Sequence, residues 1–179
     1  MTHKHSLLLA VAFLCAACAA PSRIVSNKAA DYTQEPKRLF VVTDIGTDWG
    51  MDFFNAFKAR LGPIVAECGG VLEISRISSL ELDENVHVRK AVAFKADSLL
   101  SIRRNGGTKD QYGGTIDVIY DSRLHDIKSN KVVWRSSTRF ARAPLFPIAE
   151  RGQTLAIELT NKMKTDGLWH NCPVIAPKT

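Results

Sequence analysis

Apolar residues recur at helical spacing in the segment that runs from residue 48 to residue 68. Six of them lie three or four positions apart: Trp49, Phe53, Phe57, Leu61, Ile64 and Cys68. This spacing predicts a helix that buries one face. Thr47 or Asp48 is a suitable amino-terminal cap, and Gly69-Gly70 is a suitable stop. Pro63 is expected to kink or divide the helix.

A second helical pattern follows Pro147, a residue that is favoured in the first turn of a helix. Its apolar face contains Ile148, Gly152, Leu155, Leu159 and Met163. The pattern ends at Asp166-Gly167, and glycine is the usual residue just after a helix. The chain is therefore expected to close with a helix that covers part of a sheet.

Five other segments have the pattern of strands: residues 38–43, 71–77, 98–104, 115–126 and 131–142. The first is almost continuously apolar, as expected inside a sheet, and the later ones tend to alternate. Asn105-Gly106-Gly107 and residues 127–130 provide turns between the last three, which predicts an antiparallel meander. Residues 78–96 mix acidic, basic and apolar positions, and they fit a short helix or an irregular strand.

Together these elements predict the α+β class. We expect a two-layer sandwich in which a mostly antiparallel sheet of about five strands has two helices on one face. The 179-residue chain divides into a predicted signal peptide at 1–17, a tether at 18–36 and a single domain at 37–179. The tether has no apolar periodicity, and the domain is long enough to bury a core.

The amino terminus has the composition of a secretory signal. Lys4 precedes the apolar run Leu7–Leu14, which is too short to cross a bilayer as a mature helix, and small residues follow. This segment fits three interpretations: a lipoprotein signal, an ordinary signal peptide cut near Ala19 or Ala20, or a buried core helix. The core helix fits worst, because no polar pattern accompanies the run.

The stretch Leu14-Cys15-Ala16-Ala17-Cys18 resembles the bacterial lipobox. That resemblance implies that Cys18 is acylated and becomes the new amino terminus, with Cys15 as the alternative acceptor. It also implies an outer-membrane lipoprotein that faces the periplasm, because residue 19 is alanine and not aspartate. Three acyl chains, palmitate among them, exceed the two signals that stable membrane anchoring requires.

Cys68 and Cys172 are the two cysteines beyond the lipobox. An oxidising periplasm favours a disulfide between them, and two buried free thiols are the alternative. His170 and Cys172 form a single close pair without a second pair at ligand spacing, so no metal site is predicted. No cofactor is expected.

The formal net charge is +6, which favours anionic partners such as lipid phosphates. Nucleic acid is a poor partner for an exported protein. Four arginines are candidates for binding an anionic partner: Arg103, Arg123, Arg135 and Arg139. Arginines on an exposed sheet face suit phosphate or carboxylate groups, although such a face also serves simply to keep a sheet soluble.

Asp44-Ile45-Gly46-Thr47-Asp48 resembles the first phosphate loop of the sugar-kinase and actin superfamily. Members of that superfamily use two lobes and ATP, and one exported domain offers neither. We therefore expect no nucleotide, and we interpret the stretch as a strand-to-helix turn. The role of Asp44 itself stays open.

Signals for catalysis are weak. The sequence contains no G-x-S-x-G and no H-E-x-x-H motif. His125 lies beside Asp126, but neighbouring residues of a strand point to opposite faces. Asp117 and Asp121 share one face of a strand, where most carboxylates are solvated. We therefore expect no enzymatic activity.

The order of elements, together with "YDSRLHDIKSNKVVW" at residues 120–134, resembles small envelope-assembly lipoproteins such as the lipopolysaccharide-assembly lipoprotein LptE. This resemblance implies a non-enzymatic outer-membrane lipoprotein that binds or scaffolds a membrane protein or an anionic glycolipid. The alternatives are a periplasmic hydrolase that uses Asp44, Asp48 or His125, and a small-ligand-binding lipoprotein with an apolar cavity between sheet and helices.

Overall fold

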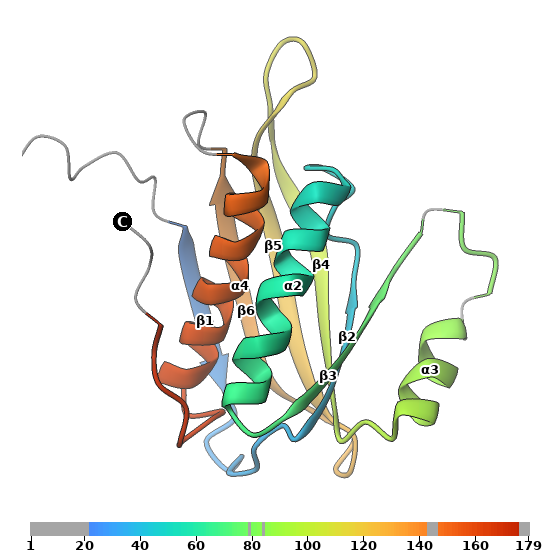
Figure 1. Ribbon diagram of the computed structural model, residues 1–179, viewed down its shortest axis with the longest axis vertical. Helices are drawn as coiled ribbons and strands as arrows, with labels where there is room; N and C mark the ends of the chain where they lie inside the picture. Colours follow the sequence, from blue (N-terminus) through green and yellow to red (C-terminus); the bar gives the residue numbers. More distant parts are fainter. Residues whose placement is uncertain (1–21, 79, 84, 143–146, 176–179) are drawn as a thin grey trace, which may run out of the picture.

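The computed structural model describes residues 22–78, 80–83, 85–142 and 147–175, which form one six-stranded sheet and three helices (Figure 1). The predicted signal peptide and both candidate acceptors, Cys15 and Cys18, lie outside these residues. The elements are β1 (Arg23–Lys28), β2 (Arg38–Thr43), α2 (Met51–Glu67), β3 (Val71–Arg76), α3 (Val86–Phe94), β4 (Ser98–Lys109), β5 (Thr115–Asp126), β6 (Lys131–Ala141) and α4 (Ile148–Thr165).

The sheet is open and mixed, with strand order β1-β6-β5-β4-β2-β3. β2 runs parallel to both β3 and β4, and the other neighbours are antiparallel. The α+β class and the β4-β5-β6 meander are confirmed. The predicted count of about five strands was wrong by one strand, and the helices do not all lie on one face.

The missing strand is β1, which lies inside the predicted tether. It pairs with β6 along its whole length, from Arg23 opposite Arg139 to Lys28 opposite Trp134. Its sequence RIVSNK has only two apolar residues, and its positions alternate between exposed and half-buried. A strand at a sheet edge needs no apolar run, and so the pattern gave no signal for it. The folded domain therefore begins before residue 37.

The main core lies between the sheet and the helix pair α2 and α4, which pack side by side (Figure 1). Phe53, Phe57 and Ile64 of the predicted stripe are fully buried, and each buried side chain of this size contributes roughly 1.5–3 kcal/mol. Gly152 of α4 permits the close approach of the helices, because a Cβ there would lie 2.3 Å from the carbonyl oxygen of Phe53.

Both predicted amino-terminal caps of the first helix were wrong. α2 begins at Met51, and the residue before it is Gly50 with a φ of 84°. Thr47 instead donates its hydroxyl to the carbonyl of Asp44 (2.7 Å), so the chain makes an extra turn before the helix starts. α2 continues through Pro63 as one helix and is not divided.

β4 is longer than predicted, because Gly106 and Gly107 lie within the strand and not in a turn. Pairing between β4 and β5 shifts register between Arg104 and Gly107. Gly107 has a φ of 139°, and a Cβ there would lie 2.3 Å from the carbonyl oxygen of Asp117. The two glycines therefore form a β-bulge, and the chain reverses later, at residues 110–114.

Residues 78–96, for which two structures fitted, contain the helix α3. It packs on the face of the sheet opposite α2 and α4, where Phe40, Val42 and Ala91 make a second, smaller core. Phe40 and Val42 alternate along β2 with Leu39 and Val41 of the main core. This alternation explains why β2 is apolar throughout: both of its faces are covered.

The carboxyl-terminal segment returns to the end of α2. Cys68 and Cys172 form a disulfide across a sequence separation of 104 residues, with the Cα atoms 4.8 Å apart. The predicted disulfide is therefore confirmed. Trp169 is buried beside it and donates its indole N–H to the carbonyl of Pro36 (3.2 Å). These contacts attach the last residues to the core.

Candidate anion-binding face

The four candidate arginines belong to three adjacent strands. Arg103 lies on β4, Arg123 on β5, and Arg135 and Arg139 on β6. All four are exposed, and they alternate along their strands with buried residues of the main core. They therefore share the sheet face that points away from α2 and α4. Their separate surroundings decide which of them is available to a ligand.

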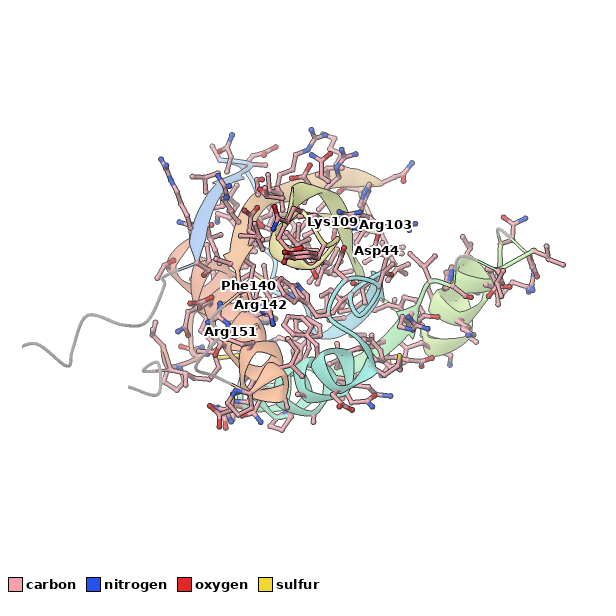
Figure 2. All side chains as sticks on the ribbon, turned by 90° about the horizontal axis from the view of Figure 1, so that it is seen from above. Asp44, Arg103, Lys109, Phe140, Arg142 and Arg151 are labelled. Carbon is pink, nitrogen blue, oxygen red and sulfur yellow. A yellow bond between two sulfur atoms is a disulfide. The ribbon has the colours of Figure 1, made fainter. Side chains whose placement is uncertain are left out.

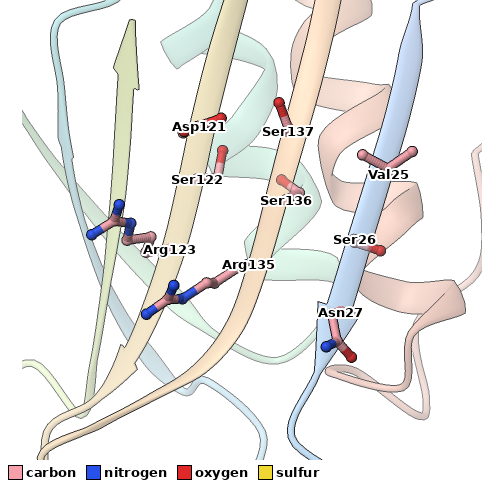
Figure 3. A pocket seen from close by; sticks show the side chains of 9 residues that line it. All are labelled: Val25, Ser26, Asn27, Asp121, Ser122, Arg123, Arg135, Ser136 and Ser137. Atoms are coloured by element: carbon pink, nitrogen blue, oxygen red, sulfur yellow. The ribbon is translucent and has the colours of Figure 1, made fainter. Parts of the chain in front are cut away.

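Arg123 and Arg135 form the centre of this face, because they are direct cross-strand partners. The row continues on both sides, with Ser101 of β4 opposite Arg123 and Asn27 of β1 opposite Arg135. Figure 3 shows both guanidinium groups projecting from the sheet, with the helices behind it. Like charges in directly opposite positions destabilise a sheet.

Neither Arg123 nor Arg135 makes a salt bridge within the described part of the chain. They line an open groove of about 390 Å³ that runs across β5, β6 and β1. The other lining residues are Val25, Ser26, Asn27, Asp121, Ser122, Ser136 and Ser137. Of the polar residues, Asn27 and Ser137 share the outward face with the arginines and are suited to hydrogen-bonding an anion. Ser122 and Ser136 are buried, and the hydroxyl of Ser26 donates to Asp166.

Arg139 differs from this pair, because its charge is already balanced. Its guanidinium donates to the carboxylate of Asp117 at 2.9 Å, and the hydroxyl of Thr108 donates to the same oxygen at 2.8 Å. The bond from Arg139 is the main cause that holds the pKa of Asp117 below its usual range. Asp117 is therefore the structural partner of Arg139.

Arg103 is exposed and lies directly opposite Asp121 of β5. The carboxylate of Asp121 accepts a hydrogen bond of 2.5 Å from the side-chain amide of Asn105. An acidic neighbour thus offsets part of the charge of Arg103. The structure brings all four predicted residues onto one face, and only Arg123 and Arg135 are direct cross-strand partners of each other. Asp121 lines the same groove, two residues before Arg123, but forms a salt bridge with neither of them within the described residues.

His125 responds to the same pair of charges. It lies two residues beyond Arg123 on the same face of β5. Partial burial is the largest cause that lowers the pKa of His125, and the positive charges of Arg123 and Arg135 lower this pKa further. No acidic side chain is among the groups that shift the pKa of His125. The lowered pKa is consistent with a positive electrostatic potential from the two arginines.

Asp44 and Asp48, which the phosphate-loop and hydrolase hypotheses both used, are held by Arg104. The carboxylate oxygens of Asp44 accept the backbone N–H of Arg104 at 3.0 and 3.1 Å. Asp48 forms a salt bridge of 3.2 Å with the Arg104 guanidinium. Asp44 therefore satisfies a backbone donor where β2 and β4 separate, and this answers the open question of its role.

One hydrogen-bonded pair of polar side chains was not predicted from the sequence. Ser75 of β3 and His87 of α3 share a hydrogen bond of 2.9 Å between Oγ and Nδ1. Ser75 is only 5% exposed, and burial is the main cause that lowers the pKa of His87. Nothing in the spacing of these residues could have predicted the contact, because it depends on where α3 packs. This hydrogen bond links α3 to β3 of the sheet.

Within the described ranges, no group of three or more histidine, cysteine, aspartate or glutamate side chains is placed to hold a metal ion. Among the same residues, no helix combines the length and the apolar character that a membrane span needs.

Comparison of the sequence with protein-family models and with curated proteins gives no match. Solved structures do match. PelC from Paraburkholderia phytofirmans, crystallised as a dodecamer, superimposes with a TM-score of 0.52 at 14% sequence identity, over 83% of this chain and 98% of PelC. The two chains share a fold. At this identity the likeness extends to the fold alone.

A second crystal form of PelC, from a variant protein, gives a TM-score of 0.49 at 14% identity, over 78% of this chain and 96% of that chain. The lipoprotein GNA1162 from Neisseria meningitidis gives 0.42 at 15% identity, over 73% and 99% of the two chains. These structures are PelC and a lipoprotein and not LptE, and so the resemblance to LptE stays a prediction.

Proposed function

We propose that this protein is a lipid-anchored lipoprotein of the cell envelope that binds a phosphate or carboxylate group of another envelope component. The binding site is the groove around Arg123 and Arg135. One observation carries this proposal: two arginines stand directly opposite each other in the sheet without an acidic partner in the described chain. Two like charges in directly opposite positions cost stability, and a bound anion would offset that cost.

The chemistry of the groove fits an oxyanion. A guanidinium group offers a planar set of donors that matches the oxygens of phosphate or carboxylate, and a pair of them gives several charge-assisted hydrogen bonds. Ser137 lies two residues beyond Arg135 on β6, Asn27 lies on the neighbouring strand β1, and both line the same groove. The bound anion would also remove the repulsion between Arg123 and Arg135, so ligand binding and sheet stability are coupled.

The envelope location is supported by two independent features. Residues 14–18 resemble a lipobox with Cys18 as the acceptor. Cys68 and Cys172 form a disulfide, and such bonds persist in oxidising compartments such as the periplasm. The outer membrane is the proposed site of the anchor, with the folded domain on the periplasmic side.

A binding role is favoured over a catalytic one because three acidic residues that were considered for catalysis already have structural partners. Asp44 and Asp48 hold Arg104, and Asp117 holds Arg139. His125 lies between positive charges, which oppose its protonation and provide no orienting acid. A general acid or base needs a partner that tunes and positions it, and these residues lack that arrangement.

Photo-crosslinking in the native host tests the proposal. A benzoylphenylalanine at Ser137, inside the groove, is expected to capture a specific envelope component, and the same group at Lys58 on exposed α2 serves as the matched control. The yield at Ser137 should fall when Arg123 and Arg135 are both changed to threonine. Equal capture from the two positions, or capture that ignores the arginines, would count against the site.

A further inference from the structure

We propose that the tip of the β4–β5 hairpin, residues 110–114 with Tyr112 at its apex, rests in the headgroup region of the membrane that carries the lipid anchor. The proposal rests on the acylation of Cys18 put forward above. It adds an orientation for the domain and a second contact with the lipid surface. It follows from three features: the length of the tether, the height of the hairpin and the chemistry of its tip.

The segment between Cys18 and the folded domain is much shorter than the predicted tether of residues 18–36, because β1 lies within that range. The hydroxyl of Ser22 already donates to Glu158 of α4, and β1 starts at Arg23. Only Ala19, Ala20 and Pro21 separate Cys18 from Ser22. Four steps along an extended chain span about 14 Å at most. An acylated Cys18 therefore holds the first strand of the sheet within about that distance of the lipid surface.

The hairpin rises from the same end of the sheet. Arg23 lies opposite Arg139, and Arg139 lies opposite Ile119 of β5. From Ile119 to Thr115 the strand advances about 13 Å, and the turn at residues 110–114 lies further out still, so the tip reaches at least as far from this level as the tether does. Figure 1 shows the hairpin extending beyond the start of β1 and beyond the amino-terminal ends of α2 and α4. The tip can therefore meet the surface of a membrane in which Cys18 is anchored.

The tip is hydrogen-bonded within itself. The carboxylate of Asp110 accepts the backbone N–H groups of Tyr112 (2.9 Å) and Gly114 (2.8 Å). The backbone N–H of Asp110 donates to the carbonyl of Gly114 at 2.8 Å, and its carbonyl accepts the N–H of Gly113 at 3.0 Å. The loop therefore holds its shape with Tyr112 pointing outward.

Tyr112 is 88% exposed, although its loop is fixed. A tyrosine ring has an apolar body and a polar end, and it is enriched where hydrocarbon meets water. Ile116 is also exposed, and the basic residues Lys109 and Arg142 lie at this end of the molecule (Figure 2). Cations next to an interfacial aromatic ring suit the anionic headgroups of a leaflet.

The test uses the acylated full chain in vesicles of phosphatidylethanolamine and phosphatidylglycerol. Tyr112→Cys is labelled with a nitroxide, and Lys128→Cys in the β5–β6 turn, at the far end of the sheet, is the matched control. Cys68 and Cys172 are joined in the disulfide and do not compete for the label. Electron spin resonance then compares collision with oxygen and with a water-soluble nickel complex.

The label at position 112 is expected to lose nickel accessibility several-fold on reconstitution, while the label at position 128 stays as accessible as in solution. Flotation with the vesicles is measured on the same samples. Protein that floats while both labels stay equally accessible overturns the orientation and leaves the lipid anchor intact. Protein that fails to float, like Cys18→Ser, overturns the anchor and the orientation together.

Discussion

At the scale of single residues, the binding role proposed for Arg123 and Arg135 carries a cost to stability that can be measured. Each directly opposes the other across β5 and β6. Replacing Arg135 with threonine keeps a good strand former and removes the repulsion, so the free energy of unfolding should rise by about 0.2–1 kcal/mol. Urea denaturation at low ionic strength checks this, because salt screens the effect.

Arg139→Thr is the matched control for that substitution. It lies on the same strand and face, but it removes the partner of buried Asp117. Stability should therefore fall and not rise. If both substitutions changed stability in the same direction, the distinction between a balanced and an unbalanced arginine would be wrong.

His125 gives a second readout at this scale. Because Arg123 and Arg135 help to lower its pKa, the pKa should rise in Arg135→Thr and also when an anion occupies the groove. A folded pKa below the unfolded value near 6.5 means that the unfolded chain binds the proton more readily. His125 therefore costs stability as the pH falls through 6.5 toward the lower folded value. Proton NMR titration of the imidazole measures its pKa in the wild type, in Arg135→Thr and with an anion present. An unchanged pKa in the variant and with the anion would refute both expected rises.

At the scale of elements, the contact of α2 with α4 depends on Gly152. A methyl group there would meet the backbone oxygen of Phe53, which cannot move aside as a flexible side chain would. Gly152→Ala is expected to destabilise the fold by about 1–3 kcal/mol through forced separation of the helices. Thermal denaturation measures the change.

Gly62→Ala in α2 controls for the glycine itself. No atom lies within 4 Å of a Cβ at that position. Alanine has the higher helix propensity, so the melting temperature should stay the same or rise. If Gly62→Ala lost as much stability as Gly152→Ala, the close approach of α2 and α4 would not explain the loss at Gly152.

The sequence predicted the elements that carry a strong pattern. β2, β5 and the buried faces of α2 and α4 were predicted because apolar spacing reflects burial directly. β1 was missed, because an edge strand of polar residues has no such pattern. Gly106-Gly107 suggested a turn, since glycines that form a bulge and glycines that form a turn look alike in sequence.

The candidate site was predictable as a set of residue types and not as an arrangement. The alternation of strands placed the four arginines on one face. Only the register between β5 and β6 shows that Arg123 meets Arg135 while Arg139 lies near Asp117. Register depends on the bulges and turns of the whole sheet, which spacing along one strand does not encode.

At the scale of the whole molecule, the disulfide attaches the carboxyl-terminal segment to the core. It closes a separation of 104 residues, and removing such a bond typically costs about 2–5 kcal/mol. The double substitution Cys68→Ser and Cys172→Ser should therefore lower the melting temperature markedly. Calorimetry of this variant against the wild type with and without reductant measures it; equal melting temperatures in all samples would contradict the assignment.

The central claim is that the groove binds an oxyanion through Arg123 and Arg135. The most direct measurement follows the arginine Nε–H signals by NMR during titration with inorganic phosphate at low ionic strength. The signals of Arg123 and Arg135 should shift together and saturate, the signal of Arg139 should stay, and Arg123→Thr with Arg135→Thr should abolish the response. Small unsaturable shifts of all arginines, unchanged in the double variant, would contradict the claim.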